Sequence, residues 1–477
     1  MVDYDASNSK ASKTKTQYIA ALAATTGAFA AGTTLGWSSP VKSLLVNTST
    51  DFQPEYDFEI TSQDFAWIGS LVTLGAAVVC LFIGTILQAV GRKLTMLLLV
   101  IPFTVGWILV TFASNLAMLD VGRFLLGISG GAFCISAPTY TSEISEASIR
   151  GTLGTYFQLM MVVGVLFPYI IGSQTTAFTL NLMCGSLPII FGIIFVFIPE
   201  SPAYLVSKAK TSAAISSLKW LRGDAYDYTR ELDELQAQNE SEKRNKVSFV
   251  AALSRRSTLK AIFISWGLMF FQQASGINAI IFYTTEIFAS TGSSIDASLS
   301  TIIFGVMQVI TVFISSMIVD KLGRRLLLLP STIVLTLSTF TLGIYFYMRD
   351  QNVDSVADIG WLPIVAVCSY IILFSIGIGP IPWIMMGELF ANDIKGVAGS
   401  LAGAVNWMVA FIVTSTFSAM SDQFGIGQTF WIFSGFSFMS ILFVYFFVPE
   451  TKGKTLTEIQ RMLEGEKVNE ITVQTKF

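Results

Sequence analysis

The sequence predicts an all-α polytopic membrane protein whose twelve transmembrane helices form two pseudo-symmetric bundles of six. Composition, the spacing of apolar stretches and motifs repeated between the two halves of the chain predict this fold. Of 477 residues, 53% are hydrophobic and 13% are charged, whereas about a quarter of the residues in soluble chains are charged. The 32 acidic and 29 basic residues nearly cancel, so the charge balance argues against a nucleic-acid partner.

Apolar stretches of roughly 20 residues, the length that a helix needs to cross about 30 Å of hydrocarbon, recur along the chain. Because unpaired backbone groups in lipid exclude open strands, we expect helices. The N-terminal bundle (18–198) and the C-terminal bundle (258–448) are expected to flank a polar loop (199–257) with short amphipathic helices. The expected spans are 18–40, 64–88, 94–114, 116–140, 152–172, 178–198, 258–289, 297–319, 326–347, 361–388, 397–420 and 427–448.

The distribution of positive charge predicts the orientation. With both tails (1–17 and 449–477) in the cytosol, every Lys and Arg except Lys42, Arg123 and Arg349 falls on the cytosolic side, as the positive-inside rule requires. We therefore expect an integral protein of the plasma membrane that is surrounded by membrane lipid. The Asn47-Thr48-Ser49 sequon then lies in an outer loop, so Asn47 is a candidate glycosylation site.

Three motifs occur at matching ends of spans in the two halves. "GRK" follows the second span and "DKLGRR" the eighth, "TSEISEASIRG" pairs with "GELFANDIKG", and "PESPAYL" pairs with "PETKGKT". Such repetition predicts a duplicated six-helix unit. We expect a cytosolic ion-pair network that holds the two bundles together and releases when they rock apart; the alternative is that the arginines only anchor helix ends to phospholipid. Its expected members are Arg92, Glu143, Arg150, Glu200, Arg324, Arg325, Glu388, Lys395 and Glu450.

These motifs, with "GRFLLG" (122–127), "QQASGIN" (272–278), "GPIPW" (379–383) and "NW" (406–407), resemble the sugar porter family of the major facilitator superfamily. The likeness extends over nearly the whole chain, and the short ends and first span are similar to the insect facilitated trehalose and hexose transporter subgroup. The resemblance implies the major facilitator fold and a sugar substrate, with no cofactor.

The family places sugar-binding groups in "QQASGIN". Carboxamides both donate and accept hydrogen bonds, as sugar hydroxyls do, so Gln272, Gln273 and Asn278 can replace the water that a sugar loses. The alternative is that these amides cross-link helices. By the same resemblance we expect sugar contacts from Gln158, Trp383, Asn406 and Trp407, and from Gln308, which stands where many relatives have Asn.

The resemblance also implies gates. Glycine breaks near Gly276 and Gly379, the latter beside Pro380 and Pro382, are expected to bend, and Tyr283 resembles an outer-gate aromatic. An interfacial anchoring role is the alternative for Tyr283 and for both tryptophans.

Proton coupling needs a titratable group within the membrane. The segment that carries an Asp in proton-coupled relatives has Thr34 here, and the chain has no histidine. Asp120 and Arg123 are expected to pair with each other, and Glu286 remains the one candidate. We therefore expect a uniporter for a glucose-type hexose or trehalose, functional as a monomer. The alternatives are a proton-coupled symporter and a sugar sensor.

Other chemistry is not indicated. The four cysteines lie in apolar runs without the spacing of a metal site, and no nucleophile–base pair or phosphate loop suggests an enzyme. "GISGG" (127–131) indicates close packing of helices rather than nucleotide binding.

Overall fold

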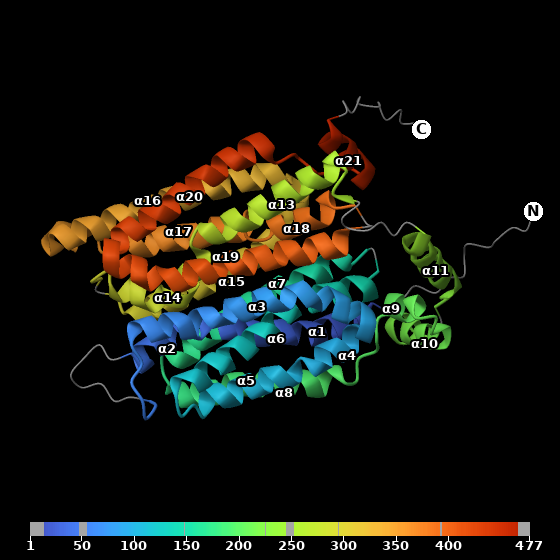
Figure 1. The fold of residues 1–477 in the computed structure, drawn as a ribbon, viewed down its shortest axis with the longest axis horizontal. Coiled ribbons are helices and arrows are strands. Elements are labelled where there is room, and N and C mark those ends of the chain that lie inside the picture. The colour runs from blue at the N-terminus through green and yellow to red at the C-terminus, as the bar shows by residue number, and fades with distance from the viewer. Residues whose placement is uncertain are drawn as a thin grey trace, which may run out of the picture.

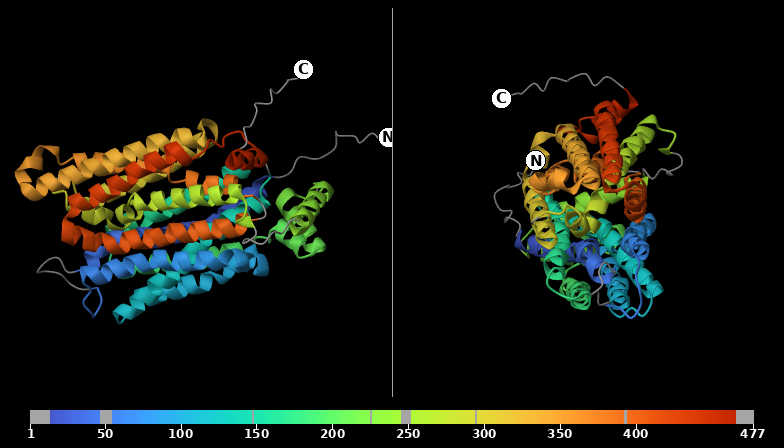
Figure 2. Two further views of the ribbon diagram at one scale, coloured as in Figure 1. Left: turned by 45° about the horizontal axis from the view of Figure 1, so that its top comes forward. Right: turned by 90° about the vertical axis from the view of Figure 1, so that its left-hand side faces the viewer.

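The computed structural model describes residues 14–46, 55–146, 148–224, 226–244, 252–293, 295–391 and 394–465. Within these residues every regular element is a helix. The helices run side by side along the long axis of the molecule (Figure 1). Seen along that axis, the N-terminal and C-terminal groups occupy opposite sides of the bundle (Figure 2). The prediction of an all-α protein is confirmed.

The first group, here called the N half, contains eight helices that correspond to the first six predicted spans. A turn at Trp37 divides the first span, and a turn at Leu99 divides the third. The helices are α1 (Lys15–Gly36), α2 (Ser38–Leu45), α3 (Ser62–Val90), α4 (Arg92–Leu98), α5 (Val100–Thr111), α6 (Leu116–Ile144), α7 (Arg150–Gly172) and α8 (Ala177–Phe195).

The second group, the C half, begins after the polar loop. Two of its spans are broken, one at Gly276 and one around Gly379. Its helices are α13 (Arg256–Ala274), α14 (Ile277–Ala289), α15 (Ala297–Leu322), α16 (Arg324–Gln351), the 3-10 helix η1 (Val353–Ile359), α17 (Leu362–Ile376), α18 (Ile381–Leu389), α19 (Lys395–Phe424) and α20 (Ile426–Phe447).

Short helices cover one end of the molecule, here called the terminal end, where α1 begins and α20 finishes (Figure 1). They are α9 (Pro202–Ser207), α10 (Thr211–Arg222) and α11 (Thr229–Arg244) from the polar loop, and α21 (Leu456–Glu464). Arg222 anchors α10 to the N half, because its side chain pairs with Glu146 at 3.3 Å and donates to the Ile144 carbonyl at 2.8 Å. The other end is here called the opposite end.

Eleven segments of the described chain are long and apolar enough to cross a membrane. The one predicted span that is not among these eleven is the seventh, 258–289, which corresponds to the pair α13 and α14. Two cations near the start of α13 and two glutamines near its end lower its hydropathy, and α14 has only 13 residues. The break between α13 and α14 therefore coincides with the polar stretch "QQASGIN" (272–278).

Glycines allow the helices of the N half to approach closely. A Cβ on Gly127 would lie 2.1 Å from the Val72 carbonyl oxygen of α3, and one on Gly32 would lie 2.1 Å from the Met161 carbonyl oxygen of α7. Without these side chains the backbones are in direct contact, as small residues permit in membrane helices. The interpretation of "GISGG" as a packing motif is confirmed.

Candidate functional site

Four amide side chains meet where α13 breaks from α14 beside α19. Asn278 Nδ2 donates to Gln273 Oε1 at 2.6 Å, and Gln273 Nε2 donates to Asn406 Oδ1 at 3.0 Å. Asn406 Nδ2 donates to Gln272 Oε1 at 2.7 Å, and Gln272 Nε2 donates to two carbonyls of the turn between α17 and α18 at 2.7 and 2.6 Å. These four side chains, here called the amide network, are each at most 6% exposed.

The backbone explains why these amides converge. Gly276 has φ 91°, a left-handed conformation that favours glycine, and a Cβ there would lie 2.6 Å from the Phe433 ring. The break turns α14 away from α13, so that Asn278 folds back onto Gln273. Similarly, the interruption between α17 and α18 exposes the carbonyls of Ile378 and Gly379, to which Gln272 donates. Pro380 precedes α18 and Pro382 lies in its first turn.

Two further predicted residues have buried polar atoms without partners. Gln308 on α15 is 5% exposed and Trp407 on α19 is 8% exposed. The Gln308 Oε1 atom and the Trp407 indole nitrogen have no hydrogen-bond partner among the described residues. A buried polar group left unpaired costs about 1–3 kcal/mol. These two side chains therefore have hydrogen-bonding capacity that a ligand can use.

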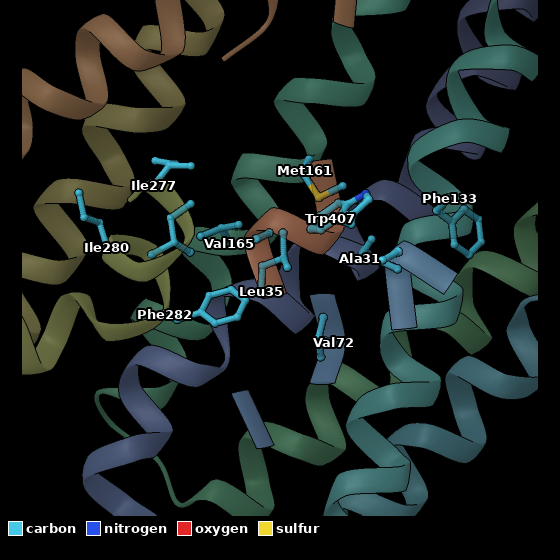
Figure 3. Packing of buried hydrophobic residues seen from close by; sticks show 14 of the residues in the cluster. Ala31, Leu35, Val72, Phe133, Met161, Val165, Ile277, Ile280, Phe282 and Trp407 are labelled. Carbon is cyan, nitrogen blue, oxygen red and sulfur yellow. The ribbon is translucent and has the colours of Figure 1, made fainter. Parts of the chain in front are cut away.

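Trp407 extends from the C half toward an apolar wall of the N half (Figure 3). Its indole borders a small cavity that is also lined by Ala31, Val72 and Met161. The N half contributes small and apolar side chains here, whereas the C half contributes amides. The centre of the molecule is therefore polar on the side of the C half and largely apolar on the side of the N half.

The structure does not bring all predicted binding residues together. Gln158 is exposed on α7, and its side chain makes no hydrogen bond to a described residue, so it lies outside the amide network. Trp383 is half-buried on α18, and its ring would lie 3.9 Å from a Cβ on Gly403 of α19. Both remain predictions.

At the opposite end, α2 of the N half contacts α14 of the C half. Lys42 Nζ lies 2.6 Å from Glu286 Oε2, and Ser39 Oγ lies 2.9 Å from Thr285 Oγ1. Tyr283 precedes these two residues of α14 and is buried, and its hydroxyl donates to the Thr414 carbonyl at 3.3 Å. Glu286, the candidate for proton coupling, is thus half of an ion pair.

The predicted pairing of Asp120 with Arg123 is wrong. Arg123 is completely buried and donates to the carbonyls of Ile68 and Thr34 and to Ser38 Oγ at 2.9–3.1 Å. Its guanidinium also lies 4.4 Å from the centre of the Trp37 ring. These acceptors come from α1, α2 and α3 and satisfy the cation without a carboxylate. One Asp120 carboxylate oxygen is buried without a hydrogen-bond partner in the described structure.

At the terminal end, each half contains the same cluster. In the N corner, Arg92 pairs with Glu143 at 2.7 Å, and Glu200 Oε1 accepts from the Arg92 and Lys93 backbone N–H groups at 3.2 and 3.1 Å. Ser201 Oγ also donates to Glu143. The N corner is defined as Arg92, Glu143, Glu200 and Ser201.

The C corner consists of Arg324, Glu388, Glu450 and Thr451. Arg324 pairs with Glu388 at 2.9 Å, and Glu450 accepts from the Arg324 and Arg325 backbone N–H groups, both at 3.0 Å. Thr451 Oγ1 donates to Glu388 Oε2 at 2.5 Å. Neither Ser201 nor Thr451 was predicted, although a hydroxyl residue follows the glutamate in both "PES" and "PET" and could have indicated them.

The two corners differ in electrostatics. Burial raises the pKa of Glu200 above the usual value for glutamate. Burial also acts to raise the pKa of Glu450, but hydrogen bonds from the backbone N–H groups of Lys452, Arg324 and Arg325 outweigh it and lower that pKa. The ionised carboxylate is thus disfavoured in one corner and favoured in the other.

Part of the predicted ion-pair network is wrong for this conformation. Arg150, Arg325 and Lys395 make no ion pair with a described residue. Arg150 instead donates to the Ser145 carbonyl at 3.2 Å, and the Arg325 side chain donates to the Tyr445 carbonyl at 2.6 Å. Each corner lies within one half, so these ion pairs do not hold the two bundles together as expected. Arg92 and Arg324 lie 51 and 64 residues from Glu143 and Glu388, so the sequence spacing could not decide these pairings. Asn47 lies outside the described residues.

Comparison with known proteins agrees with this architecture. The family described as "Sugar (and other) transporter" matches residues 13–463. The facilitated trehalose transporter Tret1 of Apis mellifera ligustica is 39% identical over 451 residues, which cover 94% of this chain and 88% of that protein. The Bombyx mori transporter of the same name is 38% identical and is covered to 87%. The chain spans about half (55%) of the longer Aedes aegypti relative, also 38% identical.

Solved structures share the fold over nearly the whole chain. The proton:xylose symporter XylE bound to 6-bromo-6-deoxy-D-glucose is 24% identical, with a TM-score of 0.73 over 94% of this chain and 99% of that one. XylE of E. coli in its inward-open conformation is 22% identical, with a TM-score of 0.75 over 94% and 98%. The family match over residues 13–463 and the relatives at 38–39% identity show that the chain belongs to the sugar transporter family, and the solved structures show that it shares their fold.

Proposed function

We propose that this membrane protein is a facilitative uniporter, acting as a monomer in the plasma membrane, for a glucose-type hexose or trehalose. The observation that carries the proposal is the pair of buried, unpartnered groups on Gln308 and Trp407 in a protein that also holds the amide network. A sugar hydroxyl satisfies both a carboxamide oxygen and an indole N–H. The trehalose transporters among its relatives support the choice of sugars.

The network is suited to exchanging partners. Its four amides are paired with each other and with backbone carbonyls. When a sugar enters, hydroxyls can replace these bonds one for one, so binding needs no unpaired intermediate. The same bonds also join α13, α14 and α19, so the cross-linking alternative describes the network without sugar.

Alternating access is supported by where the halves touch. Hydrogen bonds between described residues of the two halves gather at the opposite end, at Ser39, Lys42 and Tyr169 of the N half. The ion pairs of the two corners at the terminal end each lie within one half. If the terminal end faces the cytosol, as the positive-inside rule predicts, this conformation is closed to the outside. Rocking of the halves, with the glycine breaks bending, would then open it.

The test is counterflow in proteoliposomes with labelled glucose, fructose and trehalose. Gln273→Ala removes the donor to Asn406 and the acceptor for Asn278, so exchange of the transported sugar should fall by about tenfold or more. Gln174→Ala, at an exposed position in the turn between α7 and α8, is the control. Equal exchange by wild type and Gln273→Ala for every sugar would contradict the site.

A proton-coupled symporter is the second candidate, because one Asp120 oxygen is buried without a partner. Vesicles loaded with sugar and given a pH gradient distinguish the two. A uniporter equilibrates the sugar, and Asp120→Asn and Glu286→Gln should leave exchange nearly intact. Accumulation beyond equilibrium that is lost in Asp120→Asn would establish coupling at that residue instead.

A further inference from the structure

The contact between α2 and α14 joins a cation of one half to an anion of the other. Lys42 and Glu286 are the ion pair that crosses between the halves in the described structure, with Nζ and Oε2 2.6 Å apart. The Lys42 side chain is 10% exposed and that of Glu286 is 43% exposed. Every other ion pair among the described residues lies within one half, between the N half and α10, or within the short helices α10 and α11.

Lys42 contacts α14 at a second point. Its Nζ lies 4.9 Å from the centre of the Tyr283 ring, within the range of a cation–π interaction. Tyr283 has non-helical dihedral angles (φ −119°, ψ 16°) and therefore lies at a kink inside α14. One lysine of the N half thus touches both the kink of α14 and the carboxylate one turn beyond it.

The two partners differ in how firmly they are held. The junction of α1 and α2 is fixed to α6, because Arg123 donates to the Thr34 carbonyl and to Ser38 Oγ. In contrast, α14 follows the break at Gly276 and contains the kink at Tyr283, so its direction can change at two points. Lys42 therefore holds a fixed position, and α14, which can bend at Gly276 and at Tyr283, packs against it.

We propose that Lys42 and Glu286 form an electrostatic latch that stabilises the conformation closed at the opposite end, with Lys42 positioning the kink at Tyr283. The latch rests on the proposed alternating access but on none of the sugar-binding residues. Opening this end separates the pair and returns both charges to water. The latch therefore shifts the conformational equilibrium without contributing to sugar recognition.

A buried reporter can measure that equilibrium. Gly69 on α3 lies between the halves, where a Cβ would be 3.8 Å from Ser38 Oγ and 3.9 Å from the Phe282 ring. Gly69→Cys therefore adds a side chain in ordinary contact, in a background with the four native cysteines replaced by alanine. The readout is the rate at which a membrane-impermeant maleimide, added from outside, labels this cysteine.

Glu286→Gln and Lys42→Met each remove one charge and keep the side-chain bulk. Because partly exposed ion pairs are weak, each should raise the labelling rate by about twofold to fivefold. The exchanged pair, Lys42→Glu with Glu286→Lys, should bring the rate back toward that of the reporter alone. About 1 M salt outside should raise labelling of the reporter but not of Lys42→Met, since it shortens the Debye length to about 3 Å.

Equilibrium exchange of sugar in the same vesicles separates the two proposals. If the reporter protein exchanges no sugar, the proposed function fails. If exchange is intact but neither single variant nor salt changes labelling, the latch is overturned. An exchanged pair that labels as fast as the single variants also overturns it. Where a single variant fails to fold, the salt series on the reporter alone gives the decision.

Discussion

The two halves agree at their corners and differ at their centres. Arg92 and Glu143 are 2.7 Å apart and Arg324 and Glu388 are 2.9 Å apart, and in each half a second glutamate accepts from two successive backbone N–H groups. At the centre, the C half has the amide network, whereas the N half has apolar residues around Trp407. The two halves are thus alike where each fixes the same helix ends, and they differ at the centre, where we propose that the sugar binds.

The largest expected effect comes from breaking a corner. Arg92→Ala and Arg324→Ala each leave a half-buried carboxylate without its cation, in pairs whose arginine side chains are 15% and 10% exposed. Removing one partner of a fully buried pair costs about 3–5 kcal/mol, so these partly exposed pairs should lose about 2 kcal/mol each. The measurement is thermal unfolding in detergent.

The matched control is Arg230→Ala, whose side chain is 89% exposed and pairs with Glu234 on α11. It should leave the unfolding temperature unchanged, since exposed pairs contribute little. If Arg324→Ala lowers the unfolding temperature and Arg92→Ala does not, the corners are alike in geometry but not in energy, and the equivalence of the halves fails there.

The second effect concerns the centre of the C half. Gly276→Ala places a Cβ 2.6 Å from the Phe433 ring at a residue with φ 91°. Such strain costs about 1–3 kcal/mol and should displace Asn278 from Gln273, so sugar counterflow should fall about tenfold. Gly435→Ala is the control, because a Cβ there meets no atom within 4 Å. Equal counterflow by both variants would show that the break does not position the amide network.

Much of this arrangement follows from local sequence. Apolar length predicts the spans, and a repeated "GR" after a span predicts the corners. There Gly91 (φ 108°) and Gly323 (φ 96°) each precede a helix with a positive φ, which favours glycine. Charge asymmetry identified Lys42 as one of three cations away from the expected cytosolic side. The amides of "QQASGIN" are polar groups in an otherwise apolar span, and the family resemblance predicts that they bind sugar.

Partner choice could not be predicted, because it depends on which helices become neighbours. Arg123 is three residues from Asp120, a spacing that allows pairing on a helix, yet it reaches acceptors on three other helices. The link from Asn406 to Gln272 joins residues 134 positions apart. No periodicity within either span indicates such a bond. The fold could therefore be predicted better than the hydrogen-bond partners at its centre.

The smallest expected effect is a difference between the two corners. Glu200→Gln should be tolerated better than Glu450→Gln, because burial raises the pKa of Glu200 while backbone N–H groups lower that of Glu450. Glutamine also keeps the Oε1 acceptor, which receives three N–H groups at Glu200, but it loses the Oε2 acceptor for Arg325 at Glu450. Thermal unfolding of the two variants in one detergent measures the difference.

Lowering the pH should also distinguish the two corners, because protonation of Glu200 should stabilise the fold whereas protonation of Glu450 should destabilise it. Ionisation of Glu200 is less favourable in the folded protein than in the unfolded chain, so the fold gains stability as the pH falls through the raised pKa of Glu200. Glu450 stabilises the fold above the ordinary glutamate pKa, and this contribution is lost as the pH falls through its lowered pKa. Mild acid should therefore raise the stability of wild type relative to Glu200→Gln. Only stronger acid should reduce the difference in stability by which wild type exceeds Glu450→Gln. A pH profile that is parallel for all three proteins would mean that the corners are electrostatically equivalent, and that their difference in burial has no energetic consequence.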